Sequence, residues 1–164
     1  MILEVLRKSS IAPIGVFHEA VSDTKFHGYD IPKGTWVGSN IYAVHHSPEH
    51  WGNPQAFNPQ HFLSADGKSL KRSEALLAFS VGKRACLGET LARDELFLFL
   101  ANIYQRFETK LAEESLNVGI EPKSSFLLGP QDYKIIIKER ETVEKHYLSC
   151  EPFGINFSLN FSLN

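Results

Sequence analysis

The chain has 164 residues, of which 43% are hydrophobic and 22% charged, so its composition is that of an average soluble globular domain or part of one. The net charge of −2 argues against nucleic acid as a partner, because duplex binding needs a concentrated basic surface. Two cysteines are too few for a disulfide framework, and no apolar run reaches the roughly 18–20 residues of a membrane span. We therefore expect a cytosolic chain without a membrane anchor.

The first elements predicted are a helix and several short strands. The opening residues MILEVLRK place apolar side chains at helical spacing. Short β-rich runs between residues 9 and 39, with Pro32 and Gly34 as a hairpin turn, predict a small antiparallel sheet. A short helix is expected over residues 41–46, and the prolines that follow exclude a long one. We expect the aromatic residues of this proline segment to pack onto a core.

The clearest helix is predicted for residues 89–107. Its apolar side chains recur at spacings of three and four, at Ala92, Leu96, Phe99, Leu100, Ile103 and Phe107. The middle of this segment, LFLFLA, is apolar almost all round and is expected to be fully buried. A hairpin tip at Gly129 and Pro130 and a strand over 133–138 follow. The expected fold class is mainly α with small antiparallel β-sheets over residues 1–140, followed by an irregular or disordered tail, 141–164.

The stretch FSVGKRACLGE carries the candidate chemistry. Cys86 lies immediately before the long helix, where backbone amides, Lys83 and Arg84 favour the thiolate over the thiol. Gly82 and Gly88 permit positive φ and let a large flat ligand approach the backbone. The planar fork of Arg84 suits a carboxylate. A flat group, a metal and carboxylates together describe haem, with the Cys86 sulfur on the iron and Arg84 on a propionate.

Other interpretations of Cys86 follow from the residues alone. A structural buried cysteine in a glycine loop accounts poorly for so many specified positions in so short a stretch. A zinc ligand is disfavoured, because partner cysteines or histidines at short spacing are absent. A Cys–His nucleophile stays open, since any of the seven histidines could approach the thiol in space.

The stretch FSVGKRACLGETLARDELFLFL closely resembles the haem-binding signature of the cytochrome P450 family, the haem-thiolate monooxygenases, and is most like the microsomal type of animals. Glu4-Val5-Leu6-Arg7 matches the family's E-x-x-R motif, and NPQAFNPQHF matches its aromatic–Pro segment, in the same order and spacing. The resemblance runs from about Met1 to about Glu139. It implies the C-terminal, haem-binding part of the cytochrome P450 fold, in truncated form.

The resemblance implies roles for the residues of the cysteine stretch. Cys86 would be the axial ligand of the iron in haem b (iron protoporphyrin IX). Arg84 would pair with a propionate, and Phe79 would pack beside the sulfur and help to tune the iron. Gly82 and Gly88 would shape the loop under the porphyrin.

Further residues take implied roles outside that stretch. His18 would reach another propionate. Glu4 and Arg7 would form a buried ion pair that ties down the aromatic–Pro segment, and His61 stands where the family usually has the arginine of that network. The stretches IAPIGVF and SFLLGP would supply substrate contacts, with Ile14, Val16, Phe126 and Leu127 as the candidates.

The implied reaction is monooxygenation of a lipophilic small molecule by O2, with electrons derived from NADPH. The implied partners are NADPH–cytochrome P450 reductase, docking near Lys83 and Arg84, and cytochrome b5. A full-length relative would lie on the cytosolic face of the endoplasmic reticulum membrane. We find no distal helix with its acid–threonine pair in this sequence, so we expect the chain alone to be inactive. The alternatives are a non-catalytic haem-binding or truncated paralogue, and a cysteine-dependent redox protein without haem.

Overall fold

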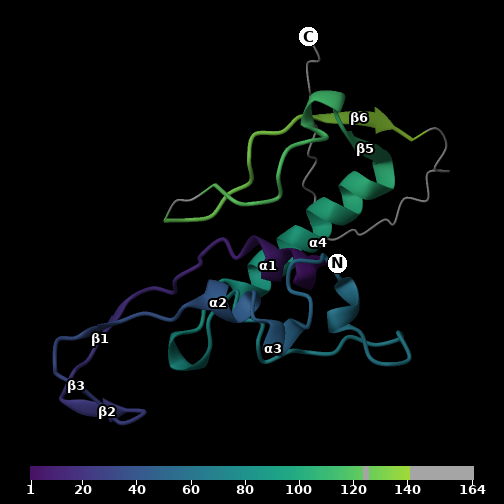
Figure 1. The fold of residues 1–164 in the computed structure, drawn as a ribbon. Helices are drawn as coiled ribbons and strands as arrows, with labels where there is room; N and C mark the ends of the chain where they lie inside the picture. Colours follow the sequence, from purple (N-terminus) through teal and green to yellow (C-terminus); the bar gives the residue numbers. More distant parts are fainter. Residues whose placement is uncertain (124–125, 141–164) are drawn as a thin grey trace, which may run out of the picture.

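The structure is a computed structural model that describes residues 1–123 and 126–140 (Figure 1). Ser125 of the predicted hairpin tip and the tail 141–164, with Cys150, lie outside the described residues, so the predicted boundary at 140 stays a prediction. The helices, strands and 3₁₀ turns follow in the order α1 (Ile2–Ser9), β1 (His18–Glu19), β2 (Thr24–Phe26), β3 (Tyr29–Ile31), β4 (Trp36–Val37), α2 (Ile41–His45), α3 (Pro48–Trp51), η1 (Pro59–Phe62), η2 (Gly82–Arg84), α4 (Glu89–Arg106), β5 (Phe107–Leu111), η3 (Glu113–Ser115) and β6 (Ile135–Glu139).

Helix α1 confirms the predicted N-terminal helix and lies at the centre of the core. It is amphipathic, and its buried residues are Glu4, Leu6 and Arg7. The helix ends at Ser10, which adopts a left-handed conformation with φ of 39° and donates its amide to the Leu6 carbonyl. The buried apolar side chains Leu6, Ile41, Trp51 and Phe62 come from α1, α2, α3 and η1. The core of the described residues is therefore small, and three short elements hold α1 in place.

The predicted small sheet forms as two separate antiparallel pairs. β2 pairs with β3, and β1 pairs with β4. The tight turn between β2 and β3 is formed by His27 and Gly28, both with positive φ, as a two-residue hairpin loop requires. Pro32 and Gly34 turn the chain from β3 to β4 instead, so their assignment to a hairpin was wrong. The reason is long-range pairing, because β4 returns to β1 and not to its neighbour in sequence.

The proline segment packs onto the core as its aromatic residues predict. Asn40 caps the predicted short helix α2 by accepting the Ala43 amide at 3.0 Å. Pro48 occupies the first turn of α3, where its missing amide hydrogen costs no hydrogen bond. Trp51 and Phe62 are buried, whereas Phe57 stays 53% exposed. Two of the three aromatic side chains therefore form part of the core around α1.

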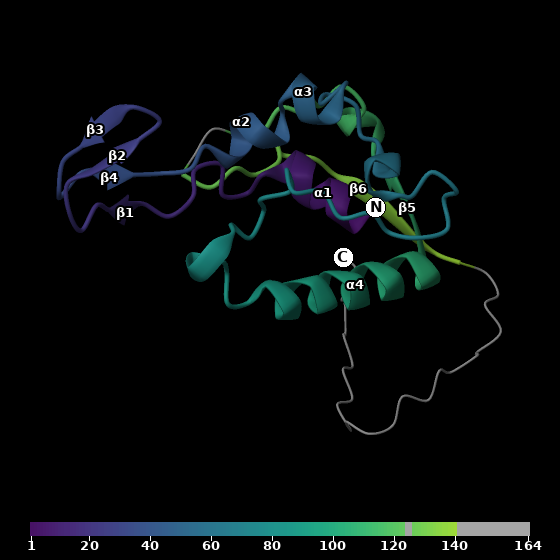
Figure 2. The ribbon, with the colours of Figure 1, turned by 90° about the horizontal axis from the view of Figure 1, so that it is seen from below.

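Helix α4 confirms the long predicted helix, but the expectation that its middle is buried was wrong. Phe97, Leu98 and Phe99 are 59–65% exposed. Figure 2 shows α4 along one side of the molecule, with α1, α2 and α3 on the other. An apolar cavity lies between α4 and the residues of α1 and η1, lined among others by Leu3, Phe62, Phe97, Leu100 and Tyr104. Only one side of α4 faces the rest of the described chain. Because the middle of α4 is apolar on all sides, its other sides expose apolar side chains.

Strands β5 and β6 close the described part of the chain. They pair antiparallel, with Thr109 opposite Ile137. Phe107, predicted as the last residue of the helix, is already extended and begins β5. The amide of Lys123 donates to the Gly129 carbonyl at 2.8 Å, which supports the predicted hairpin near Gly129 and Pro130. No helix among the described residues is both long and apolar enough to cross a bilayer.

Candidate functional site

The stretch around Cys86 folds into a tight turn directly ahead of α4. The Cys86 amide donates to the Phe79 carbonyl at 2.8 Å, which closes the stretch on itself. Within it, the 3₁₀ turn η2 is completed by a 3.1 Å hydrogen bond from the Ala85 amide to the Gly82 carbonyl. Cys86 is a free, exposed thiol. The turn therefore presents one sulfur atom at the surface, three residues before α4 begins.

The two glycines of this turn have different roles. Gly82 has φ of +75°, a conformation that strains any residue with a side chain. Gly88, which precedes α4, has φ of −91°, a conformation open to any residue, so the positive φ expected there is not adopted. A methyl group at Gly88 would come within 3.9 Å of the Cys86 sulfur. Gly82 is thus needed for the backbone path, and Gly88 keeps space free beside the sulfur.

Phe79 ties the turn to the first turns of α4. The Arg93 guanidinium lies 5.4 Å from the centre of the Phe79 ring, within the range of a cation–π contact. Arg93 also binds Glu89, with Nη2 2.7 Å from the carboxylate oxygen. The half-buried ring is therefore held by a side chain of α4.

The cations of the turn point to solvent. Lys83 and Arg84 are both exposed, and Arg84 makes no salt bridge within residues 1–123 and 126–140. The fork of Arg84 is therefore open to an external carboxylate. His18 lies exposed on β1, opposite Val37 of β4, and no hydrogen bond in the described part of the chain joins it to the turn.

Glu4 and Arg7 form an ion pair at 2.6 Å, and neither side chain has exposed surface. Arg7 donates all five of its N–H groups: Nε and Nη2 bind Glu4, Nη1 binds the carbonyls of His45 and Pro54, and Nη2 also binds that of Ala56. The guanidinium also lies 5.1 Å from the centre of the Trp51 ring. One side chain of α1 thereby joins α2 to the proline segment.

Glu4 receives contacts from the same segment. Burial by itself raises the pKa of Glu4, but hydrogen bonds from Arg7 and from the Asn58 amide, together with the charge of Arg7, outweigh it and hold that pKa below its ordinary value. The Asn58 amide donates to Glu4 at 2.8 Å. His61 also reaches Glu4, but its Nδ1 lies 3.5 Å away, at the limit for a hydrogen bond. The structure thus brings Glu4, Arg7 and His61 together, with His61 as the weakest member.

The two stretches expected to contact substrate lie next to each other. The Leu128 amide donates to the Ile11 carbonyl at 2.8 Å, which joins segments more than a hundred residues apart in sequence. Their apolar side chains point to solvent, with exposed fractions of 49% for Ile14, 82% for Val16, 80% for Phe126 and 53% for Leu127.

His45, which no sequence pattern singled out, is joined to the Glu4–Arg7 network through its carbonyl. Its side chain is fully buried, and Nε2 accepts the Leu77 amide at 2.8 Å. Nδ1 lies 2.8 Å from Ser10 Oγ. Burial lowers the pKa of His45 to about 4, with smaller contributions from the charges of His46 and Arg7. A usable signal was its spacing of four from Ile41 on α2, because that spacing places both side chains on one helix face.

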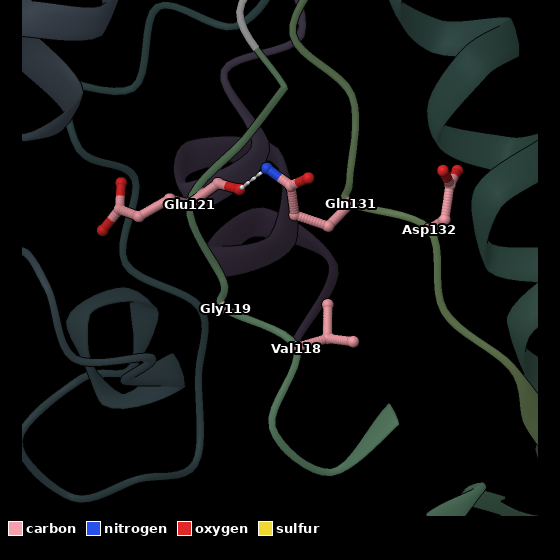
Figure 3. A pocket seen from close by; sticks show the side chains of 5 residues that line it. All are labelled: Val118, Gly119, Glu121, Gln131 and Asp132. Carbon is pink, nitrogen blue, oxygen red and sulfur yellow. Dashed lines mark hydrogen bonds between the residues drawn. The ribbon is translucent and has the colours of Figure 1, made fainter. Parts of the chain in front are cut away.

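A second pocket has a lining that includes no residue of the cysteine turn. Figure 3 shows its lining, Val118, Gly119, Glu121, Gln131 and Asp132, with Gln131 donating to the Glu121 carbonyl at 3.0 Å. Lys123 already neutralises Asp132, since Nζ and the carboxylate oxygen are 2.6 Å apart. Among the described residues no group of three His, Cys, Asp or Glu side chains could hold a metal ion. The exposed sulfur of Cys86 is therefore the stronger candidate for a site.

The chain is similar in sequence to known proteins. Residues 1–137 match the family model described as cytochrome P450. The chain is 41% identical to farnesoate epoxidase of Bombyx mori over 142 residues, 45% identical to cytochrome P450 2L1 of Panulirus argus over 139 residues, and 43% identical to cytochrome P450 2B2 of Rattus norvegicus over 141 residues.

These alignments cover most of this chain and a minor part of each relative. They span 84–87% of the chain and 28% of each of the three proteins. The chain thus spans less than a third of the length of these curated relatives. The predicted resemblance, including its likeness to the microsomal type of animals, is confirmed. Because the family model covers more than half of the sequence, the chain belongs to the cytochrome P450 family.

Proposed function

We propose that this chain is the C-terminal, haem-binding portion of a monooxygenase that inserts one oxygen atom of O2 into a lipophilic organic substrate. The observation that carries the proposal is the exposed Cys86 sulfur, held in a glycine-containing turn directly ahead of α4. A thiolate at such a position is a soft, electron-rich ligand suited to iron. Family membership supports an oxidoreductase of the monooxygenase type.

Proteins of the cytochrome P450 family bind haem b, and the residues present fit that group. The exposed sulfur has no neighbouring Cβ on Gly88, so a flat ring can approach it. Arg84 is exposed and available for a propionate, and Phe79 lies in the same turn. His18, on β1, is proposed to reach another propionate. Cys86 would therefore hold the iron, with Phe79, Gly82, Arg84 and Gly88 around the ring.

The chain's own residues would prepare this site. Haem bound through a cysteine thiolate supplies O2 activation, because the thiolate donates electron density that favours cleavage of the O–O bond. The Phe79 carbonyl and the Gly82 turn fix the path of the backbone to Cys86, so that the sulfur leaves the turn at one defined point. Arg84 would orient the ring through a charge-assisted hydrogen bond. The buried pair of Glu4 and Arg7 would hold α1, α2 and the proline segment together.

The exposed residues of the chain suggest where its partners and its substrate would bind. NADPH–cytochrome P450 reductase, and cytochrome b5 as a second electron donor, would dock near the exposed cations Lys83 and Arg84 through charge complementarity. The joined stretches that carry Ile14, Val16, Phe126 and Leu127 would contact the lipophilic substrate. The whole enzyme would lie on the cytosolic face of the endoplasmic reticulum membrane.

We also propose that the isolated chain does not turn over substrate. The observation behind this proposal is exposure: Val16 and Phe126 are 80% or more exposed, and Cys86 is open to solvent. A site of this kind must exclude water, because water weakens the electrostatic interactions of the site and allows side reactions. Hydroxylation by this chain with reductase and NADPH would contradict the proposal.

An optical experiment tests haem-thiolate ligation. The purified chain is mixed with haem, reduced and exposed to CO, and a red-shifted Soret band is expected for thiolate ligation. The same band should be lost in Cys86→Ala, because alanine has no sulfur, while Cys150→Ala should keep it. Absence of haem uptake by the unchanged chain would contradict the proposal and favour a truncated paralogue without cofactor. A band that persists in Cys86→Ala would assign the ligand to another residue.

A further inference from the structure

His45 connects the core around α1 to the residues that lead into the cysteine turn. Its side chain has no exposed surface. Nε2 accepts the Leu77 amide at 2.8 Å, and Nδ1 lies 2.8 Å from Ser10 Oγ. Its own carbonyl accepts Arg7 Nη1 at 2.7 Å. Backbone and side chain of this one residue therefore bind both the Glu4–Arg7 network and a segment 32 residues further along.

The hydrogen bonds assign a single tautomer to this imidazole. Ser10 has one hydroxyl hydrogen, and it is donated to the Arg7 carbonyl at 2.7 Å. Ser10 Oγ must then act as the acceptor toward His45, so Nδ1 carries the ring proton. Nε2 therefore carries no proton, and its lone pair can accept the hydrogen bond from the Leu77 amide. A protonated ring would place two N–H groups face to face, in agreement with the lowered pKa of His45.

Leu77 is the entry to the cysteine turn. Its carbonyl accepts the Ser80 amide at 2.8 Å, and the Phe79 carbonyl accepts the Cys86 amide at 2.8 Å. Ser80 between them has φ of +62°, an uncommon conformation for a residue with a side chain. Such a conformation persists only where neighbouring contacts hold the backbone. The hydrogen bond from the Leu77 amide to His45 is a partly buried contact that holds this end of the turn to α2.

We propose that His45 is a positioning residue for Cys86: through the Leu77 amide it sets the backbone from which the cysteine turn departs, and so fixes where the sulfur stands. The inference rests on the proposed function of Cys86 as the haem ligand. His45 itself touches no ligand and acts through Leu77 and Phe79. Its essential atom is Nε2, because that atom makes the bond to the turn, whereas Nδ1 binds α1 through Ser10.

Two substitutions by amide side chains distinguish the role of Nε2 from that of Nδ1. In His45→Gln the side-chain oxygen reaches as far as Nε2 and can accept the Leu77 amide. In His45→Asn the shorter amide reaches only as far as Nδ1, so it can bind Ser10 and leaves the Leu77 amide without an acceptor. His46→Gln is the matched control, since His46 is the neighbouring histidine, and its ring is stacked on Tyr42 and bonded to the Tyr42 carbonyl at 3.0 Å.

The experiment uses the full chain and two measurements that do not depend on turnover. Hydrogen exchange resolved by NMR reports on the Leu77 amide, which in His45→Asn should exchange about 10- to 100-fold faster, as expected for the loss of a partly buried hydrogen bond. With haem, dithionite and CO added, the red-shifted Soret band of His45→Asn should be weakened or shifted. His45→Gln and His46→Gln should resemble the unchanged chain in both measurements.

Each result decides for or against the inference. Equal behaviour of the Asn and Gln variants would overturn it, because a residue that only fills space or binds Ser10 would not distinguish them. A thiolate band in the unchanged chain that stays the same in His45→Asn would overturn the inference alone. No thiolate band in the unchanged chain would overturn the proposed function, and this inference with it. Should His45→Asn fail to fold, the ¹⁵N shifts of the unchanged His45 ring decide instead: a proton on Nε2 would exclude the bond to Leu77 and refute the proposal.

Discussion

Arg7 and Glu4 meet at 2.6 Å in the core, and the same guanidinium binds the backbone carbonyls of His45, Pro54 and Ala56. A buried ion pair by itself is weak support for stability, because removing two charges from water is costly. Here the five donors of Arg7 are all used, so the cost of desolvation is offset by charge-assisted hydrogen bonds. The pair thereby connects α1 to segments that no local interaction would bring to it.

Arg7→Lys is expected to lower the free energy of unfolding by about 2–4 kcal/mol, because lysine keeps the charge opposite Glu4 but leaves carbonyls of the core without a donor. Lysine has three donors on one nitrogen, so it cannot bind Glu4 and three carbonyls at once. Chemical denaturation followed by circular dichroism measures the change. Arg93→Lys is the control: its pair with Glu89 is partly exposed, and a loss of about 0.5 kcal/mol or less is expected. Similar losses in both variants would contradict the role assigned to Arg7.

The stability of the chain should fall as the pH is lowered from 6.5 toward 4, because of His45. Its pKa is about 4 in the folded chain and 6.5 ordinarily, so in this window the unfolded state binds a proton that the folded state does not. The stabilisation is complete above pH 6.5, and about 3 kcal/mol is lost by pH 4. Denaturation at several pH values gives the slope, which should become shallower in His45→Phe.

The control for this pH dependence is His46→Phe. Burial also lowers the pKa of His46, but that side chain is only half buried, so the slope should change less than in His45→Phe. Glu4 acts in the same direction at lower pH, because its pKa is held below 4.5 and its contribution is lost as the pH falls below that value. A stability that rises on acidification between pH 6.5 and 4 would refute the assignment.

Gly82→Ala and Gly88→Ala should affect the cysteine turn differently. At Gly82, φ of +75° makes alanine strained, and a loss of about 1–2 kcal/mol in the stability of the turn is expected. At Gly88 the backbone is ordinary, so folding should be nearly unchanged, but the added methyl group lies 3.9 Å from the Cys86 sulfur. Alkylation of Cys86 by a bulky maleimide should therefore be slowed in Gly88→Ala. If both variants have unchanged stability, the turn does not depend on Gly82.

His61→Ala should cost less than about 1 kcal/mol of unfolding free energy. Its Nδ1 lies 3.5 Å from Glu4, and the ring meets the edge of Trp51 at 5.4 Å between centroids. Neither contact is strong, and Arg7 and the Asn58 amide already satisfy the carboxylate. Thermal and chemical denaturation check this value. A loss as large as that of Arg7→Lys would show that the imidazole is a full member of the network.

Local spacing predicted the features that depend on nearest neighbours in the chain. The E-x-x-R spacing places Glu4 and Arg7 on one helix face, and the apolar repeat predicted α4 within one residue of its ends. The turn around Cys86, with its glycines and cations, could be predicted for the same reason, since a turn is formed by residues close in sequence. The strand β6 was predicted, but its partner β5 was not: FETKL alternates in polarity, yet it is only five residues long and follows directly on the helical pattern of α4.

Only the tertiary structure decided what depends on contacts between distant segments. The burial of the middle of α4 was expected from its apolar sequence, yet burial requires covering chain, and the described residues cover one side. The pairing of Leu128 with Ile11 and of His45 with Leu77 joins residues whose separation in sequence carries no periodic signal. The amino-acid sequence by itself therefore determined the chemical nature of the site, a cysteine in a glycine-containing turn. The fold decided which buried side chain holds that turn, because backbone amides find their acceptors in space and not along the chain.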